Sequence, residues 1–402
     1  MKILQINSVY KTGSTGKIVS DLHNCYISKG YSSYVLYGRG KKIKEANVYK
    51  ISSELEAKIH SFLSLLFGVD LAFSPLSTKN AIKMIKKVSP DIVHLHCLNA
   101  HYINAYRLIN YLKKNKIKTI ITIHAENMHT AGCEHAMDCN KWKTGCNHCP
   151  VIKGLISQVF RDDAKYCFEK MRQSIKGFDS LLVVGCSKWI TNRCEESLIF
   201  KNHKCITIKN GIDVSSFSYI ESSIIRERFN LDCNKKIILH VTPNFDHPIK
   251  GGRFIIELAK RMPDYNFVVV GSYAKINIPN LYFVGHIDSK EELANYYSNA
   301  DCLAMTSYRE NYPTVCLEAS SCGLNIVGFN SGGIKETIPF DMGECVEPYD
   351  LDMFADALKK WANKGRKKVD YHVKRPFEMA NDYLKAYEEI LPNEFIKFYK
   401  KK

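Results

Sequence analysis

The stretch that decides the fold is DCLAMTSYRENYPTVCLEA, residues 301–319. Residues 301–306 are typical of a buried strand, a polar loop follows, and Pro313 stands where the first turn of a helix tolerates proline. The same strand–loop–helix pattern recurs around it, with further strands expected at 236–241, 265–271, 281–285 and 325–328. Strands that alternate with helices predict βαβ units and a parallel sheet.

The N-terminal half repeats this alternation, with strands expected at 2–8, 33–37, 91–96, 118–124 and 181–186. A chain of 402 residues that is 45% hydrophobic is too long for one ordinary core. We therefore expect an α/β protein with two Rossmann-like domains, 1–207 and 208–375. A C-terminal helix within 376–402 is expected to return to the first domain. Ligands of such sheets bind at the carboxyl ends of the strands, so the two sheets are expected to face each other across a cleft.

The composition excludes several classes of protein. Charged residues make up 24% of the chain and glycine and proline are not enriched, which excludes a disordered or collagen-like chain. No run of 18 apolar residues is present, so no membrane-spanning helix is expected. Residues 1–6 read directly as a strand rather than as a signal peptide, which predicts a cytoplasmic protein.

The positive charge is confined to one half of the chain. Residues 1–207 carry 31 Lys and Arg against 15 Asp and Glu, whereas residues 208–402 carry 26 of each kind. A one-sided field of this kind suggests an anionic partner: a membrane surface, a phosphorylated substrate or nucleic acid. A solvated lysine-rich surface explains the excess equally well.

Two carboxylates flank the start of the helix expected at 314–321. Glu310 lies just before the helix and Glu318 lies within it, so both can face one crevice. Free backbone N–H groups at the helix start can hold a phosphate or a polar sugar group. One carboxylate could bind the hydroxyls of a sugar ring and the other those of a ribose. A first-turn acid followed by a solvated helical glutamate fits the spacing equally well.

Five motifs resemble those of glycosyltransferase family 4 and occur in the order found in that family. They are the E-x7-E of Glu310 and Glu318 with segment 319–323 directly after it, the glycine-containing segment 331–336, N-G-I-D at 210–213 with Phe217, C-S-K-W at 186–189 and T-I-H at 122–124. They span nearly the whole chain. The resemblance implies the two-domain architecture called the GT-B fold.

The resemblance also implies roles for individual residues. His124 and Glu310 are the expected catalytic pair at the donor sugar, and Glu318 is expected to bind the nucleotide ribose. Lys250 is expected to neutralise the diphosphate, with Arg253 as a possible helper, because the arginine usual after the first C-terminal strand is missing from 241–244. The other expected donor-binding residues are Gly13, Gly16, Asn311, Tyr312, Thr314, Gly332 and Gly333. The loop that holds Gly13 and Gly16 lacks P-loop spacing, and a plain strand–helix turn is its alternative.

The activity implied is that of a retaining glycosyltransferase using a UDP- or GDP-linked sugar. The acceptor would be a glycan or lipid-linked glycan in capsule, exopolysaccharide or lipopolysaccharide O-antigen assembly. For a lipid-linked acceptor the enzyme would act at the inner face of the cell membrane. No catalytic metal is expected, because the D-x-D at Asp350 reads as a helix cap. No nucleic acid is expected as a partner under this interpretation. The alternatives are a basic, zinc-containing nucleic-acid-binding protein and an inactive sugar-binding relative.

Four cysteines lie close together in a segment expected to be an insert, residues 130–150. They are Cys133, Cys139, Cys146 and Cys149, and His129, His135 and His148 are nearby substitutes. Four thiolates in a short loop suit a tetrahedral structural zinc. Free thiols, disulfides or a cluster are the alternatives.

One apolar segment, 62–73, is too short to span a membrane. The favoured interpretation is a core helix. The alternative is docking into a membrane interface beside Lys83, Lys86 and Lys87.

Overall fold

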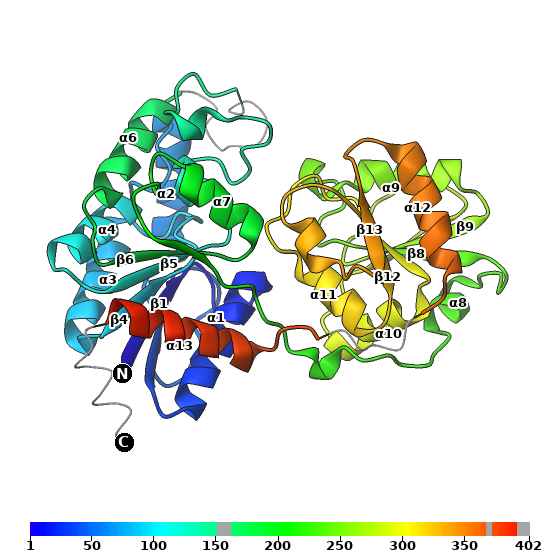
Figure 1. The fold of residues 1–402 in the computed structure, drawn as a ribbon, viewed down its shortest axis with the longest axis horizontal. Helices are drawn as coiled ribbons and strands as arrows, with labels where there is room; N and C mark the ends of the chain where they lie inside the picture. Colours follow the sequence, from blue (N-terminus) through cyan, green and yellow to red (C-terminus); the bar gives the residue numbers. More distant parts are fainter. Residues whose placement is uncertain (151–161, 367–371, 392–402) are drawn as a thin grey trace. The chain divides into compact units, whose positions relative to one another are not determined.

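The computed structural model describes residues 1–150, 162–366 and 372–391, which divide into two compact units (Figure 1). Unit 1 comprises Met1–Asn210 together with Pro376–Lys402, and unit 2 comprises Gly211–Arg375. The first division therefore falls at Asn210, close to the predicted boundary at 207. The chain after Arg375 belongs with the N-terminal unit.

Unit 1 is built on a parallel sheet whose strand order, among the described residues, is β3-β2-β1-β4-β5-β6-β7. The strands are β1 Lys2–Asn7, β2 Ser32–Tyr37, β3 Val48–Lys50, β4 Ile92–Leu95, β5 Thr119–Ile123, β6 Leu181–Gly185 and β7 Cys205–Thr207. After β1 the chain adds β2 and β3 on one side of that strand, and it then adds β4 on the other side of β1. The strand order thus reverses between β1 and β4, which is where sheets of this kind bind ligands.

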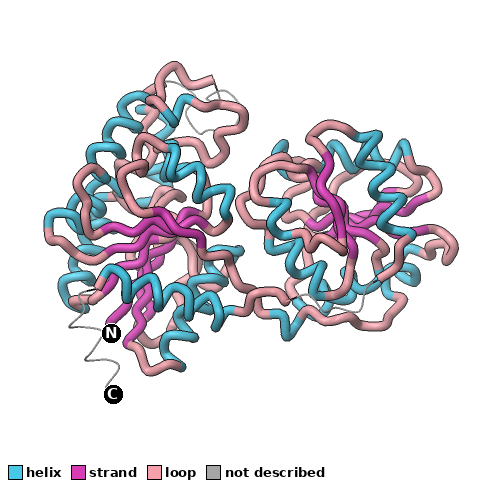
Figure 2. The backbone as a smooth tube through the Cα atoms, in the orientation of Figure 1, coloured by secondary structure: helices cyan, strands magenta, loops and turns pink. Residues whose placement is uncertain are grey.

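Helices cover both faces of this sheet (Figure 2). They are α1 Gly13–Ser28, α2 Glu54–Phe67, α3 Pro75–Val88, α4 Ala105–Lys114, α5 Asn127–Thr130, α6 Ala164–Ile175, α7 Lys188–Glu196 and α13 Pro376–Ile390. On one face of the sheet, Ile3 of β1, Ile92 of β4 and Ile120 of β5 form a core cluster with side chains of α1 and α13. The C-terminal helix is therefore part of the core of unit 1.

Buried hydroxyl groups fix α13 to this core. The Tyr387 hydroxyl lies 2.9 Å from the Tyr26 hydroxyl and 2.8 Å from Nδ1 of His94. The Tyr383 hydroxyl lies 2.9 Å from Oγ1 of Thr122. All five side chains are buried, so each bond satisfies a polar group that water cannot reach.

Unit 2 is built on a second parallel sheet with the order, over its described residues, β10-β9-β8-β11-β12-β13. Its strands are β8 Lys236–Val241, β9 Tyr265–Val270, β10 Leu281–Gly285, β11 Cys302–Met305, β12 Asn325–Phe329 and β13 Gly343–Val346. The strand order reverses between β8 and β11. The predicted strands of this unit match these bounds within a residue or two, because each is a short buried run with clear turn residues after it.

The helices of unit 2 pack against opposite faces of its sheet. They are α8 Ile224–Phe229, α9 Gly252–Arg261, α10 Lys290–Asn299, α11 Thr314–Ser321 and α12 Leu351–Asn363. Ile238 of β8 packs in one core cluster with α9 and α12, whereas its neighbour Leu239 packs in the other with α10 and α11. This alternation is the two-residue period of a strand buried on both faces.

The D-x-D at the start of α12 is a helix cap, as predicted. Asp350 is the N-cap residue, and its carboxylate accepts a hydrogen bond from the Met353 backbone N–H at 3.0 Å. The carboxylate satisfies one of the N–H groups that the first helical turn leaves unpaired.

The expectation that 62–73 forms a core helix is wrong. The helix α2 ends at Phe67 before Gly68, whose φ of 65° is left-handed and terminates it. Phe62, Leu66 and Phe67 are 63%, 47% and 45% exposed. The described helices include none that is long and apolar enough to cross a membrane.

We predict that Tyr387→Phe lowers the free energy of unfolding by about 1–3 kcal/mol, because it leaves buried polar groups of Tyr26 and His94 without their partner. Denaturant titration measures the change. Tyr49→Phe, at a residue 38% exposed in the same unit, is the control. Equal stability of the two variants would contradict the anchoring role of this network.

Candidate functional site

Three loops of unit 2 meet at one edge of its sheet. They follow β8, β11 and β12, which are adjacent strands. Because the sheet is parallel, the carboxyl ends of these strands lie at the same edge. The loops converge on residues 306–310, next to the point where the strand order reverses.

The loop after β8 is joined to the loop after β11 by two hydrogen bonds. The Tyr308 backbone N–H donates to the Ile249 carbonyl at 2.7 Å, and the Thr306 hydroxyl donates to the Gly251 carbonyl at 3.0 Å. Gly251 has a φ of 79°, and a Cβ there would lie 1.9 Å from the Thr306 carbonyl oxygen. Only glycine therefore allows this approach.

This junction brings two predicted donor-site residues together. The Lys250 ammonium lies 2.7 Å from Oε1 of Glu310. Their side chains are 32% and 19% exposed, so the pair is partly shielded from water and still open to a ligand. The positive charge predicted for a diphosphate and the carboxylate predicted for a sugar thus lie side by side.

The loop after β12 closes on the same segment. The Gly333 backbone N–H donates to the Glu310 carbonyl at 2.8 Å, and the Ser331 hydroxyl donates to the Tyr308 carbonyl. Gly332 has a φ of 66°, and a Cβ there would lie 2.0 Å from the Glu310 carbonyl oxygen. The two predicted glycines therefore set the backbone of Glu310.

The helix α11 starts beside this junction. Its N-cap position is Pro313, whose side chain makes no capping hydrogen bond, and its first turn contains no acid. Such a helix start carries partial positive charge and N–H donors suited to an anion. The predicted residues Asn311, Tyr312 and Thr314 belong to this loop and first turn.

Glu318 lies in the second turn of α11 and has a defined partner. The Tyr297 hydroxyl from α10 donates to Oε2 of Glu318 at 2.9 Å. Tyr297 is buried, and burial together with the negative charge of Glu318 raises its pKa well above the usual value. The hydroxyl therefore stays protonated and holds the carboxylate in place.

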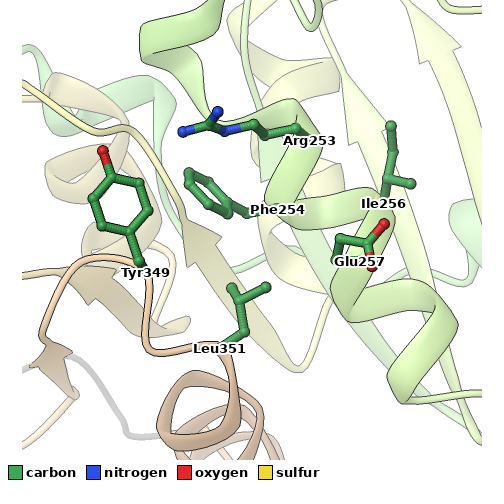
Figure 3. Close-up of a pocket in the computed structure, with 6 residues that line it drawn as sticks. All are labelled: Arg253, Phe254, Ile256, Glu257, Tyr349 and Leu351. Carbon is green, nitrogen blue, oxygen red and sulfur yellow. The ribbon is translucent and has the colours of Figure 1, made fainter.

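Arg253 has different surroundings. Its guanidinium carbon lies 4.6 Å from the centre of the Phe254 ring and 5.8 Å from that of Tyr349. Arg253 lines a pocket of about 540 Å³ together with Ile256, Glu257 and Leu351. Figure 3 shows these side chains. The arginine stacks on aromatic rings in this structure, so its predicted role at the diphosphate stays a prediction.

In unit 1, Gly13 and Gly16 lie at the carboxyl edge where the order reverses. Gly13 has a φ of 62°, and the Lys11 backbone N–H donates to the Gly16 carbonyl at 3.0 Å. A Cβ at Gly16 would lie 3.1 Å from Cγ2 of Val9 and 3.2 Å from the Lys11 nitrogen. The two glycines shape the tight turn into α1.

His124 follows β5 at this edge and is held by His96. Its Nε2 lies 3.1 Å from Nδ1 of His96, whose Nε2 lies 3.3 Å from Oε1 of Gln5. The amide oxygen only accepts, so the His96 proton is on Nε2 and its Nδ1 accepts from His124. Burial lowers the pKa of His124 to about 4, so its ring is neutral at pH 7.

Trp142 holds the cysteine-rich insert together. Its ring is buried, its Nε1–H donates to the Cys139 carbonyl at 2.8 Å, and the Arg193 guanidinium carbon lies 4.4 Å from the ring centre. The Lys141 ammonium donates to two carbonyls of the same loop, those of Asn147 and His148. The insert is therefore an ordered loop anchored to the body of unit 1.

The four predicted thiols interact with one another. A hydrogen bond between Cys133 and Cys149, burial, and the nearby thiols of Cys146 and Cys139 raise the pKa of Cys133. Among the described residues, no three His, Cys, Asp or Glu side chains already form a metal-ligand set. The structure thus brings the four thiols near one another and leaves the zinc prediction open.

Several residues of the site were not predicted from the sequence. Tyr297 orients Glu318, Ser331 joins two loops, and His96 with Gln5 orients His124. A polar residue within an apolar strand, as in the I-V-H-L-H run that ends at His96, was a usable signal. Ser331 begins the predicted glycine-containing segment 331–336, which was a usable signal as well. Tyr297 contacts Glu318 from another helix, and its sequence neighbourhood carries no such signal.

Family models match almost the whole chain. Residues 15–216 match the model of Glycosyltransferase Family 4, and residues 221–374 match that of Glycosyl transferases group 1. The chain belongs to glycosyltransferase family 4.

Individual glycosyltransferases resemble this one over most of its length. The Escherichia coli (strain K12) protein named "Putative colanic acid biosynthesis glycosyl transferase WcaC" is 24% identical over 365 residues, which are 86% of this chain and 87% of that protein. This enzyme is thus a transferase with a relative named for colanic acid biosynthesis.

Two solved structures share its fold. Sucrose-phosphate synthase from Thermosynechococcus elongatus has a TM-score of 0.64 at 17% identity, covering 100% of this chain and 98% of that one. Anabaena HepE, solved in complex with UDP-glucose, has a TM-score of 0.60 at 13% identity, covering 97% and 98%. These likenesses confirm the predicted fold class, an α/β protein with two Rossmann-like domains of the GT-B type.

We predict that Gly332→Ala in this glycosyltransferase lowers the affinity for a nucleotide sugar by roughly tenfold or more. The added Cβ would collide with the Glu310 carbonyl, and relieving such overpacking shifts the loop. Isothermal titration with the nucleotide sugar that best stabilises the wild type gives the affinity.

Gly285→Ala is the matched control. Gly285 also has a positive φ, of 87°, and a Cβ there meets no described atom within 4 Å. It reproduces the backbone strain without the collision. Equal donor affinity in the two variants would show that the approach of Gly332 to Glu310 has no part in binding.

Proposed function

We propose that the enzyme transfers a sugar, with retention of configuration, from a nucleotide sugar to a glycan or lipid-linked glycan during assembly of a surface polysaccharide. The WcaC relative supports the polysaccharide context. The HepE complex supports a UDP-linked donor, and a GDP-linked donor is tested beside it. The partner surface is an anionic membrane face.

The observation that carries this proposal is the convergence of three loops on Glu310. Lys250, the start of α11 and the two glycines all lie around that residue. Departure of a nucleoside diphosphate leaves negative charge, which an ammonium and helix N–H groups stabilise. The site would thus combine groups that bind a diphosphate with a carboxylate for sugar hydroxyls.

The ion pair of Lys250 and Glu310 has a function in this proposal. Without donor, each charge neutralises the other at 2.7 Å, so neither is left unpaired in a partly buried place. On donor binding, Lys250 would turn to the diphosphate and Glu310 to the sugar hydroxyls. Because contacts with the donor would replace the Lys250–Glu310 ion pair, the number of charge-assisted hydrogen bonds would stay nearly constant.

Glu318 would bind the ribose of the nucleotide. Its carboxylate, held by the Tyr297 hydroxyl at 2.9 Å, is a fixed acceptor for two neighbouring hydroxyl groups. His124 keeps the role that the family resemblance gives it, contact with the donor sugar. Its neutral ring suits hydrogen bonding to a sugar hydroxyl better than pairing with phosphate.

We predict that Glu318→Ala weakens nucleotide-sugar binding by about 1.5–3 kcal/mol, because a charge-assisted hydrogen bond to the ribose is lost. Titration calorimetry and a donor-hydrolysis assay measure the effect. Asp356→Ala is the control, since Asp356 is a surface acid of the same unit that pairs with Lys359, at 3.1 Å. Full affinity and activity in Glu318→Ala would contradict the proposed site. Wild-type protein that binds donors without hydrolysis or transfer would instead be an inactive sugar-binding relative.

We further propose that the insert holds a structural zinc ion. Cys133, Cys139, Cys146 and Cys149 are all partly exposed, and the other three thiols are near enough to raise the pKa of Cys133, so a rearrangement of this loop would supply four soft ligands. A closed four-thiolate site would order the loop around Trp142 and take no part in transfer. The metal would bind with release of thiol protons.

Metal analysis of the purified protein should find about one zinc per chain. Cys133→Ser should lose the metal and lower the melting temperature, as should a strong chelator. Cys233→Ser, at an exposed cysteine of unit 2, should change neither. Sugar transfer should proceed without added magnesium. Protein without bound metal, or a strict magnesium requirement, would contradict this proposal.

A further inference from the structure

The helix α2 carries its large apolar side chains on the outside. Leu55, Ile59, Phe62 and Leu66 are 69%, 51%, 63% and 47% exposed. Spacings of four, three and four residues place them in line along one side of a helix. We refer to these four residues as the α2 apolar face.

The buried side of α2 is made of small and polar residues. The side chains buried there are Ala57, His60 and Ser64. Nδ1 of His60 lies 2.7 Å from Oγ of Ser74, so this side is fixed by hydrogen bonding. An ordinary surface helix buries its leucine, isoleucine and phenylalanine and exposes its polar residues. The amphipathicity of α2 is inverted, so the fold of unit 1 does not account for its apolar face.

Exposed apolar side chains continue beyond both ends of α2. The Leu76 backbone N–H donates to Oε1 of Glu56 at 2.9 Å, which places the 66% exposed Leu76 near the start of α2. The Cys167 thiol lies 3.6 Å from the Gly68 carbonyl, which places the 49% exposed Tyr166 near its end. An apolar surface of this extent marks an interaction site.

Lysines gather on α3 beside this face, whereas the nearby acids are engaged in other contacts. Residues 54–91 contain five lysines and four acids. Glu54 pairs with Arg39 and Lys50, Glu56 accepts from the Leu76 backbone N–H, and Asp91 accepts from the Lys2 backbone N–H. Asp70 pairs with His101, with Oδ1 and Nε2 3.1 Å apart. The exposed lysines are Lys58 on α2 and Lys79, Lys83, Lys86 and Lys87 on α3. Lys79, Lys83 and Lys87 share one side of α3 with Leu76, because they follow it by three, seven and eleven residues.

We propose that the α2 apolar face docks onto an anionic membrane leaflet. Its four side chains would enter the boundary between headgroups and acyl chains, and the lysines of α3 would lie at the anionic headgroups. The proposal rests on the proposed function for its partner, the membrane that holds a lipid-linked acceptor. It adds the surface and the mode of contact.

Charge and chemistry favour a membrane over other partners. A symmetric dimer formed through this face would bring the lysines of one copy against those of the other. Nucleic acid would pair with the lysines and leave the four apolar side chains in water. An anionic leaflet satisfies both kinds of group at once.

Vesicle sedimentation of the full chain tests the proposal. Wild-type protein should bind vesicles of phosphatidylglycerol and phosphatidylcholine, and bind pure phosphatidylcholine far less. Ile59→Gln with Phe62→Gln should weaken binding by roughly tenfold or more, with an unchanged melting temperature because both side chains are already exposed. Ile27→Gln with Phe340→Gln, at residues 48% and 99% exposed, is the matched control and should bind like wild type.

Insertion has its own readout. Phe62→Trp should give a blue shift of tryptophan emission on adding anionic vesicles, and Phe340→Trp should give none. Replacing Lys83, Lys86 and Lys87 by Glu should reduce binding to anionic vesicles and leave the weak binding to neutral ones. Donor affinity should be unchanged in all these variants, whereas Glu318→Ala should keep vesicle binding and lose the donor.

Three outcomes would overturn the proposal. The first is full vesicle binding by Ile59→Gln with Phe62→Gln and no blue shift with Phe62→Trp. The second is no binding of wild type to anionic vesicles, with ultracentrifugation showing a dimer that these substitutions dissociate. The third is tight, salt-resistant binding to DNA or RNA without vesicle binding. None of these outcomes alters the test of the donor site, which rests on nucleotide-sugar binding alone.

Discussion

The parallel alignment of the strands in unit 2 is the constraint on which the site depends. Because β8, β11 and β12 run in one direction, their following loops must leave from one edge, and the reversal of strand order beside β8 lets them meet. The chemistry of the site then follows from which side chains these loops carry. Lys250 and Glu310 come from different βα units and are brought to 2.7 Å by this topology.

Glycine makes that meeting possible at atomic distance. Gly251 and Gly332 both have left-handed φ values and approach carbonyl oxygens at distances that exclude any Cβ. Backbone hydrogen bonds then hold the loops together, so the Glu310 backbone is set before a ligand arrives. Such preorganisation is what electrostatic stabilisation of a leaving group requires. The glycines are thus part of the site without offering a functional group.

In unit 1, the main structural feature is the attachment of α13, a helix from the C-terminal end of the chain. One side of α13 is buried in the core, and the tyrosine hydroxyls on that side have hydrogen-bond partners on β4, β5 and α1. A buried polar network of this kind specifies one position of the helix, because a shift would leave several groups unpaired. The inverted helix α2 shows the opposite case, a helix whose apolar side the core does not use.

The sequence by itself determined the two-sheet architecture, most strand positions and the ordered family motifs, because these depend on local apolar runs and turn residues. It also identified Glu310, Glu318 and Lys250 as candidates. Only the tertiary structure decided that Lys250 pairs with Glu310, that Tyr297 holds Glu318 and that His96 holds His124, since these partners lie between 21 and 60 residues apart. The orientation of α2 was likewise undecidable from its composition, because an apolar segment reads the same whether it faces a core or a membrane.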